Sequence, residues 1–287
     1  MKKNKAKIIF QELIVLFAVI LLVLSVIFIS VQSKKTKIKE DYTPTLVLHG
    51  SPTTRNSMLP MIERMSRAIN GQHDLTLVVD NHGRVHAEGK YQVLPNSIIQ
   101  IIFENNDSSE YNQVQWLGNC MRYLKKKCGI KEVNFIGHSL GGVDMLFYLS
   151  EYEPKIRQQV PRVNKVVTLG SPFNGENKED NADYKQIEKI GPEKMLKTYK
   201  LMVKNAEKYP LAVNEWLNIA GDRYDNGHGD GIVPIGSVAS LSPIMEKQHI
   251  DYQFTIIPYV SHSGLHASQR VDRVIEEFIW GNNRKKT

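Results

Sequence analysis

The segment Asn134–Gly142 constrains the fold of this chain most, because an apolar stretch runs directly into a serine flanked by glycines. It reads N-F-I-G-H-S-L-G-G, with a strand pattern at 132–136 and a helix-forming run at 143–149. G-x-S-x-G between a strand and a helix is typical of a sharp turn that exposes its serine. We expect Gly137 and Gly141 to flank Ser139 where a strained backbone leaves no room for Cβ atoms. An ordinary glycine-rich turn is the alternative that other motifs must exclude.

Strand and helix patterns alternate along the rest of the chain. Buried strands are predicted at 44–50, 75–79, 98–103, 132–136, 163–169, 215–220 and 252–257, with a hairpin after 75–79 that runs through Tyr91. Helices are predicted at 58–69, 111–127, 143–149 and 270–280. This alternation predicts an α/β fold, a mostly parallel sheet with helices on both faces.

Residues 176–210 interrupt that alternation. The segment is polar at first and then has apolar residues at helical spacing between Met195 and Val203. It follows a strand end, where lids over the binding site of α/β proteins commonly lie, so we predict a small lid insertion. A surface helix packed by its apolar stripe is the alternative.

The formal charge of +7 belongs to the two ends of the chain. Residues 1–41 hold eight lysines against three acidic residues, and 284–286 add three basic residues, which leaves a net charge of −1 for the rest. A basic groove for nucleic acid is therefore not expected. We divide the chain into a basic segment 1–12, a transmembrane signal anchor 13–31, a tether 32–43, a domain 44–281 and a basic tail 282–287.

The predicted anchor is an almost continuous aliphatic run. Leu13 to Val31 is broken only by Ser25 and Ser30, and its 19 residues approach the roughly 20 that cross a bilayer as a helix. Lysines before the run favour a cytoplasmic N-terminus, which places the domain outside a single-pass cell membrane protein. Cleavage of the segment as a signal peptide, followed by secretion, is the alternative, although the run is long and no A-x-A site follows it.

Cysteine and histidine positions suggest no metal or cofactor. Cys120 and Cys128 fall eight residues apart in one predicted helix, about 12 Å along its axis, which is too far for a disulfide. We expect free thiols, with Cys120 in the core. His82 and His86 lie in the hairpin without further ligands, so zinc is not expected there, and His228 is only a weak cation-binding candidate.

Two late loops supply partners that could activate Ser139. A serine hydroxyl is a weak nucleophile until a base takes its proton and an acid orients that base. Asp230 is the preferred acid, because Gly231 and the apolar residues 232–233 would anchor it, and Asp222 and Asp225 are rivals in the same loop. His262 is the preferred base, with His266 as the alternative. Backbone N–H groups of Ser51 and Leu140 are the expected oxyanion hole, and His49 and His138 are expected to be structural.

In this order, the motifs resemble those of the α/β-hydrolases. They are H-G at 49–50, G-H-S-L-G-G at 137–142, G-S-P-F-N-G at 170–175, D-G-I-V-P at 230–234 and H-S at 262–263. More narrowly, residues 42–281 resemble an uncharacterised family of Gram-positive bacterial α/β-hydrolases that are often membrane-anchored or secreted. The resemblance implies a Ser139–Asp230–His262 triad. Unlike many related sequences, this chain lacks a glycine-rich turn after its first His-Gly.

The resemblance implies a serine hydrolase, and carboxylic esters are the expected substrates. A small-molecule or lipid acyl ester, with a lipase-like preference for acyl chains, is the expected partner, and the N-terminal helix is the expected contact with the membrane. Thioesterase, amidase and acyltransferase activities would use the same residues, and a non-catalytic cell-surface binding protein is a further alternative. The oligomeric state is left open.

Overall fold

The computed structural model describes Phe17, residues 42–53 and residues 55–281. Two units divide the chain, residues 1–39 with 282–287 in one and residues 40–281 in the other, which is compact. The predicted anchor at 13–31, apart from Phe17, and the basic tail at 282–287 lie outside the described residues. Of the helices in the described part, none combines the length and the apolar composition needed to cross a membrane.

One eight-stranded sheet forms the centre of the domain. Its order is β3-β2-β4-β1-β5-β6-β7-β8, with β3 antiparallel to β2 and the other neighbours parallel. The strands are β1 (Thr45–Leu48), β2 (Gln72–Val79), β3 (Val85–Gly89), β4 (Ser97–Phe103), β5 (Glu132–His138), β6 (Arg162–Leu169), β7 (Glu215–Asp222) and β8 (Asp251–Pro258). The predicted strands, the hairpin and the mostly parallel sheet are confirmed.

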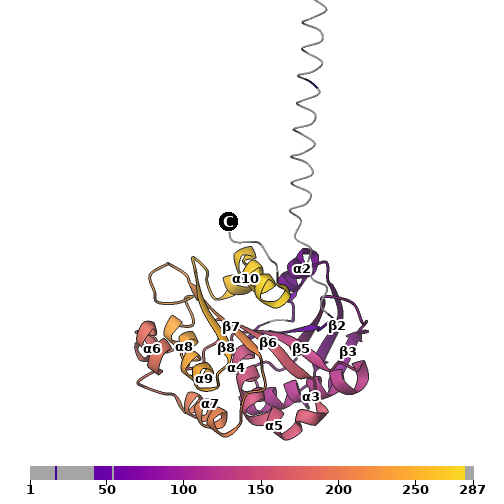
Figure 1. Cartoon of the computed structure of the whole chain (residues 1–287), viewed down its shortest axis with the longest axis horizontal. Coiled ribbons are helices and arrows are strands. Elements are labelled where there is room, and N and C mark those ends of the chain that lie inside the picture. Colours follow the sequence, from indigo (N-terminus) through magenta and orange to yellow (C-terminus); the bar gives the residue numbers. More distant parts are fainter. Residues whose placement is uncertain (1–16, 18–41, 54, 282–287) are drawn as a thin grey trace, which may run out of the picture. The chain divides into compact units, whose positions relative to one another are not determined.

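Helices cover both faces of this sheet (Figure 1). On one face lie α2 (Leu59–Ala68) and α10 (Gln269–Trp280). On the other lie α3 (Glu110–Cys128), α4 (Leu140–Phe147), the π-helix η1 (Tyr148–Tyr152) and α5 (Glu153–Ile156), followed by the 3₁₀ turn η2 (Arg157–Gln159). Because each predicted helix has an apolar face that needs the sheet for burial, its position follows from its sequence pattern.

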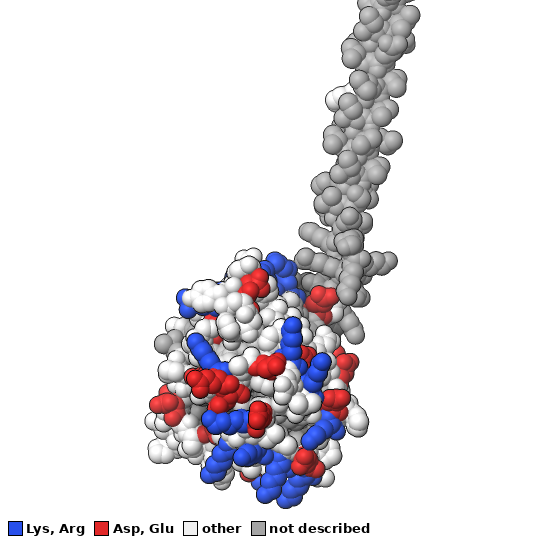
Figure 2. All heavy atoms as spheres, turned by 90° about the vertical axis from the view of Figure 1, so that its left-hand side faces the viewer, with Lys and Arg blue, Asp and Glu red and all other residues white. Residues whose placement is uncertain are grey.

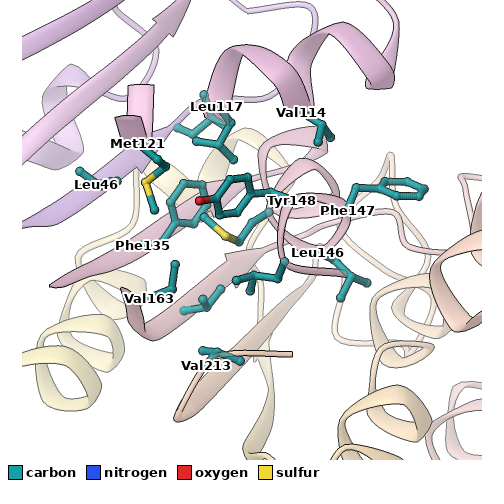
Figure 3. Packing of buried hydrophobic residues seen from close by; sticks show 14 of the residues in the cluster. Leu46, Val114, Leu117, Met121, Phe135, Leu146, Phe147, Tyr148, Val163 and Val213 are labelled. Carbon is teal, nitrogen blue, oxygen red and sulfur yellow. The ribbon is translucent and has the colours of Figure 1, made fainter. Parts of the chain in front are cut away.

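The main core lies between the sheet and the layer of α3, α4 and η1. Figure 3 shows Phe135 of β5 beside Tyr148 of η1, with Met121 and Leu117 of α3 close by. These side chains are almost completely buried. The buried residues Val114, Leu117, Met121 and Leu124 of α3 are spaced by three or four positions, so one stripe of the helix faces the sheet.

Helix α3 carries both cysteines, as predicted. Ser109 caps its N-terminus by accepting a hydrogen bond from the Asn112 backbone N–H at 3.3 Å, and Gly129 ends it with a φ of 70°. Cys120 is buried in the core, Cys128 is partly exposed, and both are free thiols. Burial raises the pKa of the Cys120 thiol, so this side chain behaves as an apolar core residue.

Residues 176–210 fold as short helices rather than as one long loop. They are η3 (Glu179–Asn181), α6 (Tyr184–Ile190) and α7 (Lys197–Lys208). The apolar stripe of α7 is buried, with Tyr199, Met202 and Ala206 in the main core. The Tyr199 hydroxyl donates to the Ser240 carbonyl at 2.8 Å. The stripe thus stabilises the helix on the domain, and a lid movement of this segment stays a prediction.

Parallel pairing brings the loops after seven strands, all except β3, to one edge of the sheet. Leu48 at the end of β1 pairs with Gly137 of β5, and His138 pairs with Leu169 of β6. The loops after β7 and β8 follow at the same edge. Two short helices, α8 (Ile235–Ala239) and α9 (Ser242–Lys247), connect these last two strands, and η4 (Ser263–His266) follows β8. Ligands of open α/β sheets bind at this edge.

Candidate active site

Ser139 lies on a tight turn between β5 and α4. Its backbone has φ 54° and ψ −125°, an unusual conformation for a residue with a side chain. The Ser139 N–H donates to the Leu169 carbonyl of β6 at 2.9 Å, which fixes the turn on the sheet. A Cβ atom on Gly137 would lie 2.7 Å from the Gly142 nitrogen, and one on Gly141 would lie 2.7 Å from the His49 carbonyl oxygen. The predicted lack of space at both glycines is confirmed.

A cavity of about 550 Å³ opens beside this serine. It brings together Ser51, Ser139, Asp230, His262 and His266, which the sequence proposes from four separate loops. The other lining residues are Pro52, Thr53, His138, Glu176, Arg223, Gly231, Ile232, Ser261 and Ser263. Most of these side chains are polar, so the wall of the cavity suits a polar or charged ligand.

Asp230 and His262 are joined by a hydrogen bond within this cavity. His262 Nδ1 donates to Asp230 Oδ2 at 2.7 Å, and the His262 backbone N–H donates to the Asp230 carbonyl at 3.0 Å. The carboxylate is buried, and its Oδ1 accepts the backbone N–H groups of Ile232 at 2.9 Å and Val233 at 2.7 Å. These bonds fix the carboxylate, and in the neutral tautomer with the proton on Nδ1 they leave Nε2 of His262 to accept a proton.

The rival acids lie elsewhere in the loop. Asp222 Oδ2 accepts the Gly227 backbone N–H, and Asp225 is exposed. Neither forms a hydrogen bond with a histidine in the part of the chain that the structure describes. The alternative base His266 contacts the edge of the His138 ring, with centroids 4.8 Å apart. Burial, with a smaller effect from His262, lowers the pKa of His266.

His138 packs between the two candidate bases. Its ring centroid lies 4.6 Å from that of His262, and its Nε2 donates to the His262 carbonyl at 3.1 Å. That bond places the proton of His138 on Nε2. Burial first, and then the proximity of His262 and His266, hold the pKa of His138 well below its ordinary value. A neutral ring therefore holds the loop of His262 in place.

His49 fixes the loop after β1. Its Nε2 accepts the Phe103 backbone N–H at 3.1 Å, so the ring proton lies on Nδ1, which donates to the Gly50 carbonyl at 2.8 Å. The Thr53 hydroxyl donates to the same carbonyl at 2.6 Å. Burial lowers the pKa of His49, although the bond to Gly50 partly opposes this effect.

The two candidate oxyanion donors follow from these backbone positions. In a trans peptide unit the N–H points away from the C=O, so fixing the Gly50 carbonyl also fixes the direction of the Ser51 N–H. Leu140 is the first residue of α4, where a backbone N–H has no partner within the helix. The Gly50 backbone approaches closely enough that a Cβ there would lie 2.5 Å from the Ser139 Cβ. The loop after β1 and the serine turn are therefore in direct contact.

Asp144 is a buried acid that sequence patterns did not single out. It lies on α4, one turn beyond the serine, and its Oδ2 has no hydrogen-bond partner among the described residues. Burial, and then the nearby Glu110, raise the pKa of Asp144 well above its ordinary value. Its carboxyl group therefore favours the neutral form.

Arg223 and Glu176 also line the cavity, although no sequence motif marked them. Arg223 follows the last residue of β7, and Glu176 follows the G-S-P-F-N-G motif after β6. Both residues could have been proposed from the sequence because they come just after the ends of strands, where side chains reach the ligand site of an α/β sheet. In the described part of the chain, no three His, Cys, Asp or Glu side chains gather as metal ligands.

A family model described as "Alpha/beta hydrolase of unknown function (DUF915)" matches residues 32–282. The chain belongs to the DUF915 family. Its fold, an eight-stranded and mostly parallel sheet with helices on both faces, is the α/β-hydrolase fold.

Two solved structures resemble this DUF915 protein. A gene product of Listeria innocua is 26% identical, with a TM-score of 0.73, and the match covers 86% of this chain and 96% of that one. A Lactobacillus plantarum protein, described in its name as a cell surface hydrolase, is 22% identical, with a TM-score of 0.64. The match covers 83% of this chain and 89% of that one. Among curated proteins, none matches the chain.

Proposed function

We propose that this DUF915 protein is a membrane-anchored serine hydrolase that cleaves carboxylic esters through an acyl-enzyme. The observation that carries the proposal is the 2.7 Å bond between His262 Nδ1 and Asp230 Oδ2 in the cavity that Ser139 lines. An acid, an imidazole and a serine on a strained turn are the groups that acyl transfer needs. Membership of an α/β-hydrolase family supports this assignment.

In the first step, Ser139 Oγ attacks the carbonyl carbon of the ester. His262 Nε2 takes the hydroxyl proton, and the Asp230 carboxylate stabilises the resulting imidazolium through its bond to Nδ1. The carbonyl oxygen becomes an oxyanion, for which the backbone N–H groups of Ser51 and Leu140 are the proposed donors. Collapse of this intermediate expels the alcohol, which receives the proton from His262.

The second step releases the acid. Water attacks the acyl-serine while His262 Nε2 takes a proton from it, and the same two N–H groups stabilise the second oxyanion. Collapse returns the proton to Ser139 Oγ and frees the carboxylic acid. Each step begins and ends with His262 neutral, a form that its Nδ1 bond to Asp230 orients for proton transfer.

The test is labelling by a fluorophosphonate probe, which reacts with activated serines. Wild type should be labelled, and Ser139→Ala should not. Ser263→Ala is the matched control, because Ser263 lines the same cavity, and it should be labelled like wild type. Unlabelled wild type, or equal labelling of Ser139→Ala, would falsify the nucleophile.

Turnover of matched esters, thioesters and amides then identifies the bond. We expect 4-nitrophenyl esters to be cleaved with a higher kcat/KM than the matching anilides and thioesters. A higher kcat/KM for the anilides or thioesters would reassign the reaction while leaving the serine in place. The apolar stripe of α7, which suggested long acyl chains, is buried in the core and no longer supports that preference.

The membrane anchor rests on sequence alone. We infer that Leu13–Val31 stays in the membrane and that the domain lies outside the cell, because lysines precede this apolar run. An alkaline phosphatase fused after residue 287 should be active in whole cells. An inactive fusion would place the domain in the cytoplasm, and a protein that lacks residues 1–31 in the culture medium would show cleavage.

A further inference from the structure

Arg223 places a positive charge in the wall of the cavity that Ser139 lines. It follows Asp222, the last residue of β7, and its side chain is exposed. The candidate triad does not use this guanidinium. A charged group beside the reacting serine affects which substrates bind, because its interaction with a substrate charge is only weakly screened at contact distance.

Five of the nine other arginines in residues 42–281 pair with carboxylates. Arg64 pairs with Asp272, Arg84 with Asp80 and Arg157 with Glu153, and the pairs Arg55–Glu88 and Arg162–Glu132 are on the surface. In contrast, no carboxylate of the described residues forms an ion pair with Arg223, although Glu176 lines the same cavity. Its guanidinium is therefore available to an anion from outside the chain.

One backbone bond and two side-chain contacts position Arg223. Its backbone N–H donates to the Gly229 carbonyl at 2.8 Å. The guanidinium carbon lies 5.1 Å from the centre of the Tyr224 ring. A Cβ atom on Gly231 would lie 3.2 Å from Arg223 Cδ and 3.3 Å from a terminal nitrogen, so the side chain lies along Gly231, next to Asp230. Stacking on an aromatic ring leaves the edge of a guanidinium free for two parallel hydrogen bonds.

A second cavity of about 530 Å³ adjoins the first. Both are lined by Gly231 and Ile232, and Tyr224 lines the second as Arg223 lines the first. Tyr224 and Ile232 are 64% and 52% exposed, which gives the second cavity an apolar surface. The pair of cavities fits a ligand that is longer than its reacting ester, with Arg223 near the junction.

The face of the domain that carries α6 and α8 does not provide a general attraction for anions. Figure 2 shows acidic and basic side chains interspersed over the face that carries α6 and α8. A surface of mixed sign has little long-range field, so charge selection depends on local contacts in the cavity.

We propose that Arg223 binds an anionic carboxylate or phosphate group of the substrate, which makes negatively charged esters the preferred substrates. This inference rests on the proposed ester hydrolysis and adds a substrate class to it. The guanidinium would form a bidentate pair with the anion, while the reacting carbonyl lies at Ser139. Glu176 opposes this preference from the same wall.

Matched esters test the proposal on either side of the reacting bond. On the acyl side, 4-nitrophenyl hydrogen glutarate is compared with the neutral 4-nitrophenyl pentanoate. On the alcohol side, 4-acetoxybenzoate is compared with its methyl ester. We expect wild type to favour the anionic member of at least one pair by about 10-fold or more in kcat/KM, as one charged contact allows. Competitive inhibition by glutarate and by glycerol 3-phosphate distinguishes a carboxylate from a phosphate.

Arg223→Ala should abolish this preference and leave kcat/KM for the neutral ester within about threefold. Arg223→Lys should retain part of it, and Arg223→Glu should invert it in favour of a 4-trimethylammoniobutanoate ester. Glu176→Gln should increase the preference for the anionic ester. Arg67→Ala, which removes an exposed arginine of α2 outside the cavity, is the control and should behave as wild type.

The proposal is overturned if wild type shows no preference in either pair, or if Arg223→Ala keeps it. Failure of the proposed function has a different signature, since neutral esters would then be stable to wild type as well as to Ser139→Ala. In that case, calorimetry compares the binding of monomethyl glutarate to Ser139→Ala and to the double variant Ser139→Ala/Arg223→Ala. Weaker binding to the double variant would show that Arg223 binds anions, and equal binding would show that it does not.

Discussion

Two separate hydrogen bonds join His262 to Asp230, one between their side chains and one between their backbones. Nδ1 lies 2.7 Å from Oδ2, and the backbone N–H of His262 lies 3.0 Å from the Asp230 carbonyl. The second carboxylate oxygen is occupied by the N–H groups of residues 232 and 233. The acid thus orients both the ring and the loop that carries it.

Replacing this acid should abolish most of the catalytic rate. Asp230→Asn keeps the shape but donates where it should accept, which favours the wrong tautomer of His262. We expect kcat for a 4-nitrophenyl ester to fall by about 10⁴-fold with KM nearly unchanged. Steady-state kinetics at pH 8 measures this. Asp225→Asn is the control in the same loop, and a larger loss there than at position 230 would move the acid to Asp225.

The loop after β1 should affect the rate through the Gly50 carbonyl. Thr53→Val removes one of the two side-chain donors to this carbonyl without changing the shape, and we expect kcat to fall by about 10-fold. His49→Phe removes the other donor, and a fall of about 10²-fold is expected. Because both changes act on the oxyanion, KM should change little. A rise in KM with constant kcat would show instead that the loop binds substrate in its ground state.

The strained backbone conformation of Ser139 should reduce the stability of the fold. Its φ of 54° and ψ of −125° suit glycine better than any residue with a Cβ. We expect Ser139→Gly to unfold at higher urea concentration than Ser139→Ala, by about 1–2 kcal/mol in the free energy of unfolding. Both variants lack the hydroxyl, so the difference isolates the backbone. Equal stability of the two would mean that the turn carries no strain.

Asp144 should make stability depend on pH. Its folded-state pKa lies above the ordinary value of 3.8, so the stability from the protonated carboxyl is complete below that pH and is lost as the pH rises through the folded-state pKa. Asp144→Asn cannot ionise. We therefore expect the variant to gain on wild type between pH 4 and pH 8, by about 1.4 kcal/mol per pKa unit crossed. Urea unfolding at pH 4 and pH 8 measures the difference in the free energy of unfolding between Asp144→Asn and wild type. A difference that is the same at both pH values would contradict this prediction.

Long elements of the fold could be predicted because their patterns are repeated over many residues. The buried strand β4 is apolar apart from Ser97 and Gln100, and α10 has an apolar face with helical spacing. The short helices α6, α8 and α9 could not be predicted, since five to seven residues carry too few turns to show a period. Their positions depend on tertiary contacts such as the bond from Tyr199 to Ser240.

The candidate site was predictable where glycine and proline mark a loop. The D-G-I-V-P motif favoured Asp230 because its apolar residues were expected to anchor the loop. In the structure Val233 is buried but Ile232 is 52% exposed, and the backbone N–H groups of both residues hold the carboxylate. Arg223 and Asp144 carry no such mark. Exposed arginines after strands and acids within helices are common in sequences. Arg223 is distinguished only by the cavity that it lines, and Asp144 only by its burial.

The order of the strands has a consequence for the newly made chain. The serine turn and the loop after β1 come from neighbouring strands at the centre of the sheet, whereas Asp230 and His262 follow β7 and β8, which are added last at one edge. During synthesis from the N-terminus, the proposed nucleophile is therefore complete long before its base exists. On the proposed mechanism, the protein cannot acylate itself or its neighbours until β8 has joined the sheet, so the end of folding also switches on the enzyme.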